Sequence, residues 1–198
     1  LGGYFKKLDK ILPLICAALT VFDIILVNSL YENGFIIESV FKTQLYSGIL
    51  GFFGSLIIGM IDYKFISKIW FVYAPVALIL QFLLFTPLGV QRDDDIAWLD
   101  LGIITIQPSE ILKLVFILTL ATHISKLGDK LNKLPNMLLL CVHGFFPAAL
   151  ITIQGDYGSA LVFLFIFACM LFIAGVSWKY IVAALAAIPP ALYVAWNY

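Results

Sequence analysis

The sequence predicts an all-α fold, a polytopic bundle of transmembrane helices with its N-terminus in the cytoplasm. The 198 residues are 63% hydrophobic and 12% charged, with a mean hydropathy of +1.05, which is far outside the range of soluble domains. The apolar residues also gather in runs of roughly 20, the length at which a helix rising 1.5 Å per residue crosses a hydrocarbon core of about 30 Å. We expect a single membrane domain over residues 1–198, without a separate soluble domain.

Apolar runs of this length predict about seven spans along the chain. In order they cover residues 11–30, 44–62, 69–86, 109–125, 137–154, 159–175 and 180–197. The first run is long and lacks a small-residue cleavage site, so it reads as an anchor helix and not as a signal peptide. The fourth run contains Glu110, Lys113 and His123, and is the least regular of the set.

Polar segments separate these runs, and their lysines predict the orientation of the bundle. Alternate segments hold Lys6, Lys7, Lys10, Lys64, Lys68, Lys126, Lys130, Lys133 and Lys179, whereas the opposite segments hold only Lys42 and Arg92. Because cytoplasmic loops carry the excess of basic residues, the first set is predicted to be cytoplasmic. The segments 32–42, 88–107 and 155–158 are then predicted to lie outside.

Charge, cysteines and histidines exclude several classes of function. The net charge is zero and the basic residues are dispersed, so no surface for nucleic acid is predicted. Cys16, Cys141 and Cys169 fall inside apolar runs, where a thiol behaves as a small buried hydrophobe. His123 and His143 stand alone without metal-ligand spacing, and we predict no metal site in the chain.

The most informative stretch is WLDLGIITIQPSEILK, residues 98–113, where an outer loop enters the fourth helix. Pro108 suits a helix start, Ser109 can cap exposed N–H groups, and Glu110 places negative charge at the positive end of the helix dipole. Glu110 and Lys113 share one helix face. Two interpretations stay open: a well-capped helix with a satisfied ion pair, or a polar pocket that binds an anionic lipid headgroup.

The second motif is the polar segment 154–159, QGDYGS, on the same predicted outer side. Gly155 and Gly158 permit positive φ, and Asp156 can close an Asx-type hydrogen bond, so a local turn is one interpretation. The alternative is that Asp156 faces a substrate groove.

Other polar residues favour ordinary structural roles. The acidic run 92–95 with Asp100 is expected to be a solvated loop, since consecutive aspartates do not converge on one cation. Asp23 and Asn28 in the first helix are expected to find partners within the bundle.

Taken together, Trp98, the run from Gln107 through Pro108 to Glu110 with Lys113, and the later segment 154–159 resemble the SEDS family of RodA, FtsW and SpoVE, and RodA most among them. The family pattern runs from a tryptophan-containing outer loop into Q-P-S-E-x-x-K and then into Q-P-D-L-G-T. Gln154, Asp156 and Gly158 match the second motif, while Gly155, Tyr157 and Ser159 replace its Pro, Leu and Thr.

The resemblance implies a peptidoglycan glycosyltransferase of cell elongation or division that polymerises lipid II in the bacterial cytoplasmic membrane. Trp98, Ser109, Glu110, Lys113 and Asp156 are implied to bind substrate, with Gln107, Pro108, Gln154 and Gly158 as structural parts of the motifs. The chain then corresponds to the N-terminal portion of a ten-span protein, and the catalytic base is implied to follow Tyr198 in a large outer loop. This portion alone is expected to be inactive.

The implied partners are undecaprenyl-linked glycan, membrane lipids and a class B penicillin-binding protein. No cofactor is implied for this portion, although a divalent cation is compatible with the whole protein. Two alternatives remain: a non-catalytic scaffold that recruits a transpeptidase, and a flippase for the lipid-linked precursor. A flippase predicts ionisable residues at mid-membrane, whereas the motifs here lie near the predicted outer surface.

Overall fold

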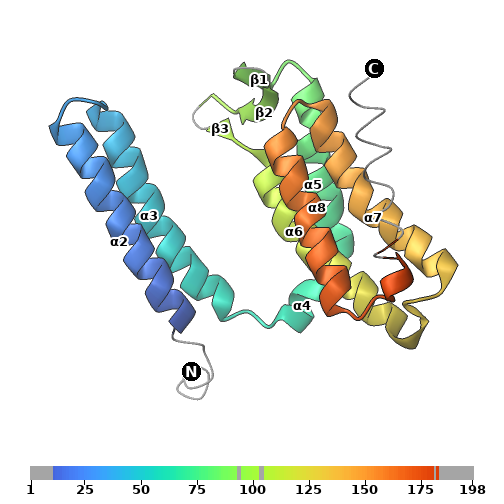
Figure 1. Cartoon of the computed structure of the whole chain (residues 1–198). Coiled ribbons are helices and arrows are strands. Elements are labelled where there is room, and N and C mark those ends of the chain that lie inside the picture. Colours follow the sequence, from blue (N-terminus) through green and yellow to red (C-terminus); the bar gives the residue numbers. More distant parts are fainter. Residues whose placement is uncertain (1–10, 93–94, 103–104, 181, 183–198) are drawn as a thin grey trace. The chain divides into compact units, whose positions relative to one another are not determined.

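A computed structural model of the chain describes residues 11–92, 95–102, 105–180 and 182 (Figure 1). The chain divides into two compact units, Leu1–Ile66 and Ser67–Tyr198. The short helix α4 (Tyr63–Lys68) contains the boundary between them.

The first unit is a helical hairpin of α2 (Ile11–Glu32) and α3 (Glu38–Gly59). The amide of Gln44 on α3 donates a hydrogen bond to the carboxylate of Asp23 on α2, and Asn28 Nδ2 donates to Glu32 Oε1 at 2.9 Å. Asp23 and Asn28 therefore have the partners within the helices that the sequence predicted. None of the described residues of this hairpin is buried, as expected where lipid replaces water as the solvent.

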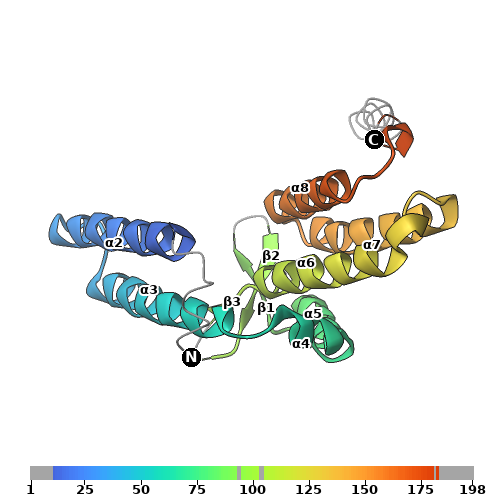
Figure 2. The same ribbon diagram turned by 90° about the horizontal axis from the view of Figure 1, so that it is seen from below.

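The second unit packs four helices, which are α5 (Trp70–Phe82), α6 (Pro108–Leu127), α7 (Leu134–Ile153) and α8 (Tyr157–Ile173). Two short 3-10 helices extend it: η1 (Leu83–Phe85) continues α5, and η2 (Gly128–Lys130) follows α6. Helix α6 contacts all three other helices, and Figure 2 shows it between α5 and α7. Helix α6 is therefore the central helix of this unit. It contributes residues to the two sites described below, one near each of its ends.

Apolar side chains from α5 to α8 form the core of this unit. Its larger buried side chains include Leu112, Phe116, Leu120, Met137, Leu140, Ile151, Phe163 and Phe167. The Phe116 and Phe163 rings lie 5.2 Å apart between centroids, which joins α6 to α8. Gly144 allows α7 to approach α8 closely, because a Cβ at this position would lie 2.5 Å from Cδ2 of Phe167.

A small antiparallel sheet occupies the segment between α5 and α6, where the sequence predicted only an outer loop. It consists of β1 (Gly89–Arg92), β2 (Asp95–Asp100) and β3 (Thr105–Ile106) in the order β1-β2-β3. Ala97 and Leu99 of β2 are 3% and 0% exposed, so this strand buries alternate residues against the helices. The all-α prediction is therefore right for the bundle and incomplete for this segment.

The predicted spans before residue 180 each fall on a helix, so the polytopic helical membrane fold is confirmed. Within the described ranges, three helical segments are long and apolar enough to cross a membrane, which are Pro13–Glu32, Pro108–Lys130 and Leu134–Ile153. Trp70–Phe85 and Tyr157–Ile173 are shorter apolar segments. The last predicted span, 180–197, lies almost wholly outside the described residues. The number of spans, the orientation and the single domain stay predictions.

Candidate functional site

The candidate site is built at the N-terminus of α6, and Gln107 is its N-cap residue. Pro108 occupies the start of the helix, as the sequence predicted, and the structure also shows it to be buried. The capping role predicted for Ser109 is wrong. Its side chain is 1% exposed, and its Oγ has no hydrogen-bond partner among the described residues.

Glu110 and Lys113 form the ion pair that their spacing predicted. Lys113 Nζ donates to Glu110 Oε1 at 2.6 Å, one turn into α6. The two side chains differ in exposure, 57% for Glu110 and 21% for Lys113. The carboxylate therefore lies near the positive end of the helix dipole and holds the ammonium group of the partly buried Lys113 side chain in place.

A hydrogen bond joins this helix start to the second sequence motif. Gln107 Nε2 donates to Asp156 Oδ2 at 3.2 Å, although the two residues are far apart in the chain. The other carboxylate oxygen of Asp156 accepts from the backbone N–H of Ser159 at 2.9 Å, which makes Asp156 the N-cap of α8. The two predicted motifs thus meet, and Asp156 makes the local hydrogen bond that its sequence context predicted.

The glycines of the second motif differ in their roles. Gly155 adopts a φ of 87°, so the turn requires the left-handed conformation there. Gly158 lies in the first turn of α8 and does not adopt the positive φ that a glycine permits. A Cβ at Gly158 would lie 3.8 Å from Oδ1 of Asp156, which is an ordinary contact distance.

A buried pair of side-chain amides includes Gln154 of the second motif. The sequence did not point to the other member of the pair, Gln81. Gln81 Nε2 donates to Gln154 Oε1 at 2.6 Å, and Gln154 Nε2 donates to the backbone carbonyl of Gln81 at 3.2 Å. Gln81 and Gln154 are 0% and 4% exposed. The signal that could have identified Gln81 is the presence of a polar glutamine inside an apolar run. The pair fixes the end of α7 against the end of α5.

Trp98 lies in β2, opposite Val90 of β1, and is half-buried. The same strand is hydrogen-bonded to the second motif, because the N–H of Ile96 donates to the carbonyl of Gln154 at 2.9 Å. The sheet therefore brings Trp98 into the assembly that also contains Gln154 and Asp156.

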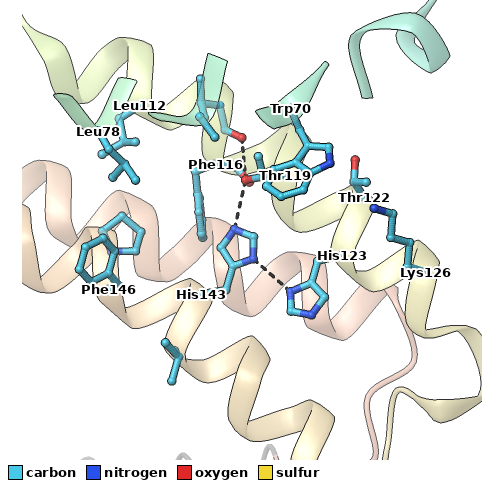
Figure 3. A pocket seen from close by; sticks show the side chains of 14 residues that line it. Trp70, Leu78, Leu112, Phe116, Thr119, Thr122, His123, Lys126, His143 and Phe146 are labelled. Atoms are coloured by element: carbon cyan, nitrogen blue, oxygen red, sulfur yellow. Dashed lines mark hydrogen bonds between the residues drawn. The ribbon is translucent and has the colours of Figure 1, made fainter. Parts of the chain in front are cut away.

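A separate cavity of about 400 Å³ lies between α5, α6 and α7. Figure 3 shows His123 of α6 and His143 of α7 in its wall, with their Nδ1 atoms 3.1 Å apart. His143 Nε2 lies 3.1 Å from the hydroxyl of Thr119. The sequence left both histidines unassigned, because their proximity depends on how two helices pack. Within the part of the chain that the structure describes, no three His, Cys, Asp or Glu side chains come together to hold a metal ion.

Comparisons with known proteins support the family resemblance drawn from the sequence. The family model of FtsW, RodA and SpoVE, described as a cell cycle protein, matches residues 7–196. A probable peptidoglycan glycosyltransferase FtsW of Geobacter sp. (strain M18) is 31% identical over 204 residues, which cover 94% of this chain and 53% of the relative. The peptidoglycan glycosyltransferase MrdB of Escherichia coli (strain K12) is 32% identical over 108 residues, which cover 54% of this chain and 28% of the relative.

Solved structures share the fold. The crystal structure of the rod shape determining protein RodA of Thermus thermophilus superimposes with a TM-score of 0.78 at 22% identity, covering 93% of this chain and 60% of that one. A chain from a structure titled for polymerization and crosslinking by a peptidoglycan synthase complex also gives 0.78, at 21% identity, covering 92% of this chain and 53% of that one. This chain spans about half the length of the first FtsW relatives. With nearly its whole length matched by the family model, the chain belongs to the FtsW, RodA and SpoVE family.

Proposed function

We propose that the whole protein is a peptidoglycan glycosyltransferase that polymerises lipid II at the outer face of the bacterial cytoplasmic membrane. The observation that carries the proposal is the Glu110–Lys113 ion pair at the start of α6, joined to the second motif through Gln107 and Asp156. Both family motifs meet in this assembly. Relatives that match the chain over most of its length are named as probable enzymes of this activity.

The proposed role of the pair is to bind the diphosphate of a lipid-linked substrate. Lys113 provides a positive charge, and Glu110 holds its ammonium group at 2.6 Å. A cation fixed in a partly desolvated site stabilises a phosphate more than a mobile surface lysine does, because the surroundings screen it less. Trp98 and Asp156 are proposed to border the groove in which this substrate binds.

The reaction transfers a glycosyl unit. An acceptor sugar hydroxyl loses its proton to a general base and forms a bond to the anomeric carbon of the donor, while the bond from that carbon to the diphosphate oxygen breaks. We propose that the base comes from the large outer loop that follows the seventh span in family members. We propose that Lys113 stabilises the other product, since the leaving undecaprenyl diphosphate carries the electron pair and the negative charge.

A class B penicillin-binding protein is the proposed partner, which would crosslink the strands that this protein makes. Support comes from the fold shared with a chain of a peptidoglycan synthase complex. A scaffold that only recruits such a partner would keep its function when Glu110 is replaced.

Growth support tests the proposal. The full-length gene, expressed in cells depleted of their own copy, is expected to restore growth, and Glu110→Ala is expected to abolish this at a normal membrane level. The matched control is Glu38→Ala, which removes the other described ion pair, Glu38 with Lys42 at 2.7 Å, outside the site. Restored growth with Glu110→Ala would reject the assigned role.

A further inference from the structure

The cavity between α5, α6 and α7 changes in polarity from one end to the other. Its α6 wall is one helix face, which runs through Leu112, Val115, Phe116, Thr119, Thr122, His123 and Lys126. The first three are apolar and the last four carry polar groups. Figure 3 shows Leu78 and Phe146 toward the Leu112 end, and Trp70 toward the Lys126 end. This gradient matches a ligand with a hydrocarbon chain and a polar head.

The polar end favours a negatively charged head. Lys126 Nζ lies 5.6 Å from the centroid of the Trp70 ring, an arrangement of a basic and an aromatic residue that is typical of membrane interfaces. No Asp or Glu is among the residues that line the cavity, and in the described ranges Lys126 makes no ion pair. Its charge is therefore available to an anionic ligand.

Three hydrogen-bonding side chains add donors to this end without adding charge. The Thr119 hydroxyl lies 2.9 Å from the carbonyl of Val115, 3.2 Å from that of Phe116 and 3.1 Å from Nε2 of His143, so its proton has three alternative acceptors. When Thr119 donates to His143, His143 Nδ1–H donates to His123 Nδ1, and Nε2 of His123 carries an N–H. In this direction of the hydrogen-bond chain, His123, which lines the cavity, has a donor at Nε2.

The cavity is open at its side. Trp70, Val142 and Phe146 line it and remain 44%, 65% and 48% exposed. Pro147, which also lines it, has no N–H to donate to the carbonyl of His143, so α7 lacks one backbone hydrogen bond at the level of the histidines. Because the three exposed side chains leave this side of the cavity open, an acyl chain can enter it from the bilayer.

We propose that this cavity binds an anionic phospholipid, with its phosphate at Lys126 and an acyl chain along Leu78, Leu112 and Phe146. Basic pockets between membrane helices are a known form of anionic lipid site. Lys126 lies 16 residues after Glu110 on the same helix, roughly 24 Å along its axis, so the two sites are at opposite ends of α6. The proposal goes beyond the proposed glycosyltransferase activity and does not depend on it.

Native mass spectrometry of the delipidated full-length protein in detergent tests the headgroup. Phosphatidylglycerol is expected to bind at least about tenfold more tightly than phosphatidylcholine with the same acyl chains. Lys126→Gln is expected to remove about tenfold of that affinity, since it removes the charge facing the phosphate. Lys130→Gln makes the same charge change at a residue that is exposed, as Lys126 is, but lies outside the cavity, and is expected to alter affinity by less than about twofold.

Two further measurements test the acyl chain. In the first, inorganic phosphate in excess is expected to leave phosphatidylglycerol bound. In the second, Val142→Trp fills the open side of the cavity and is expected to weaken the binding of phosphatidylglycerol about tenfold. Because Val142 is 65% exposed, this variant is expected to fold, and its unfolding temperature checks that. Any of three results would overturn the proposal. These are equal binding of both lipids, equal effects of Lys126→Gln and Lys130→Gln, and displacement of phosphatidylglycerol by inorganic phosphate.

Discussion

Gln107 donates a hydrogen bond to Asp156 at 3.2 Å, and this contact joins the N-terminus of α6 to the N-terminus of α8. Asp156 uses its two carboxylate oxygens for different tasks. Oδ2 accepts from Gln107, and Oδ1 caps α8 through the N–H of Ser159. These hydrogen bonds give Asp156 a structural role beside the role in substrate binding that we propose, and substitutions can separate the two.

Asp156→Ala is expected to lower the free energy of unfolding by about 1–2 kcal/mol, because α8 loses its cap and Gln107 loses its acceptor. Asp156→Asn keeps an oxygen for the cap and is expected to cost less than about 0.5 kcal/mol. Unfolding in detergent, followed by tryptophan fluorescence, measures both. If Asn is as destabilising as Ala, the cap does not account for the stability contributed by Asp156.

The buried pair of Gln81 and Gln154 predicts non-additive effects. Gln154→Met leaves the Gln81 amide buried without its acceptor, and is expected to destabilise the protein by roughly 1–3 kcal/mol. The double variant Gln81→Met with Gln154→Met removes both partners, and is expected to be more stable than Gln154→Met alone. Unfolding temperatures of the single and double variants test this. An additive loss would contradict the mutual dependence of the two amides.

Gly144→Ala is expected to destabilise the packing of α7 on α8 by about 1–3 kcal/mol, because its methyl group would lie 2.5 Å from the Phe167 ring. Gly51→Ala is the matched control, since a Cβ at Gly51 of α3 meets nothing within 4 Å. The control is expected to be neutral or stabilising by up to about 1 kcal/mol, because alanine favours the helix. Equal unfolding temperatures for the two variants would show that α7 and α8 do not approach so closely.

Much of the helical fold is predictable from the sequence, because long apolar runs determine membrane helices almost independently of tertiary context. The runs 109–125 and 137–154 coincide with α6 and α7 to within a few residues. The sheet was missed because β3 has only two residues and β1 only four, too few to show a regular alternation.

The candidate site was predictable in part. Glu110 and Lys113 are neighbours by helix spacing alone, and their ion pair is confirmed. Ser109 was misjudged because the cap of α6 falls two residues earlier, at Gln107, which places Ser109 inside the helix. The contact between His123 and His143 depends on the packing of α6 against α7, which no local pattern specifies.

Polymerisation of lipid II by the purified full-length protein is the most direct test of the central claim. The wild-type protein is expected to produce glycan strands, Glu110→Ala is expected to slow this by about 100-fold, and Glu38→Ala by less than about twofold. Glycan synthesis by Glu110→Ala at the wild-type rate would contradict the role of the ion pair. A lack of glycan synthesis by the wild-type protein would contradict the proposed activity.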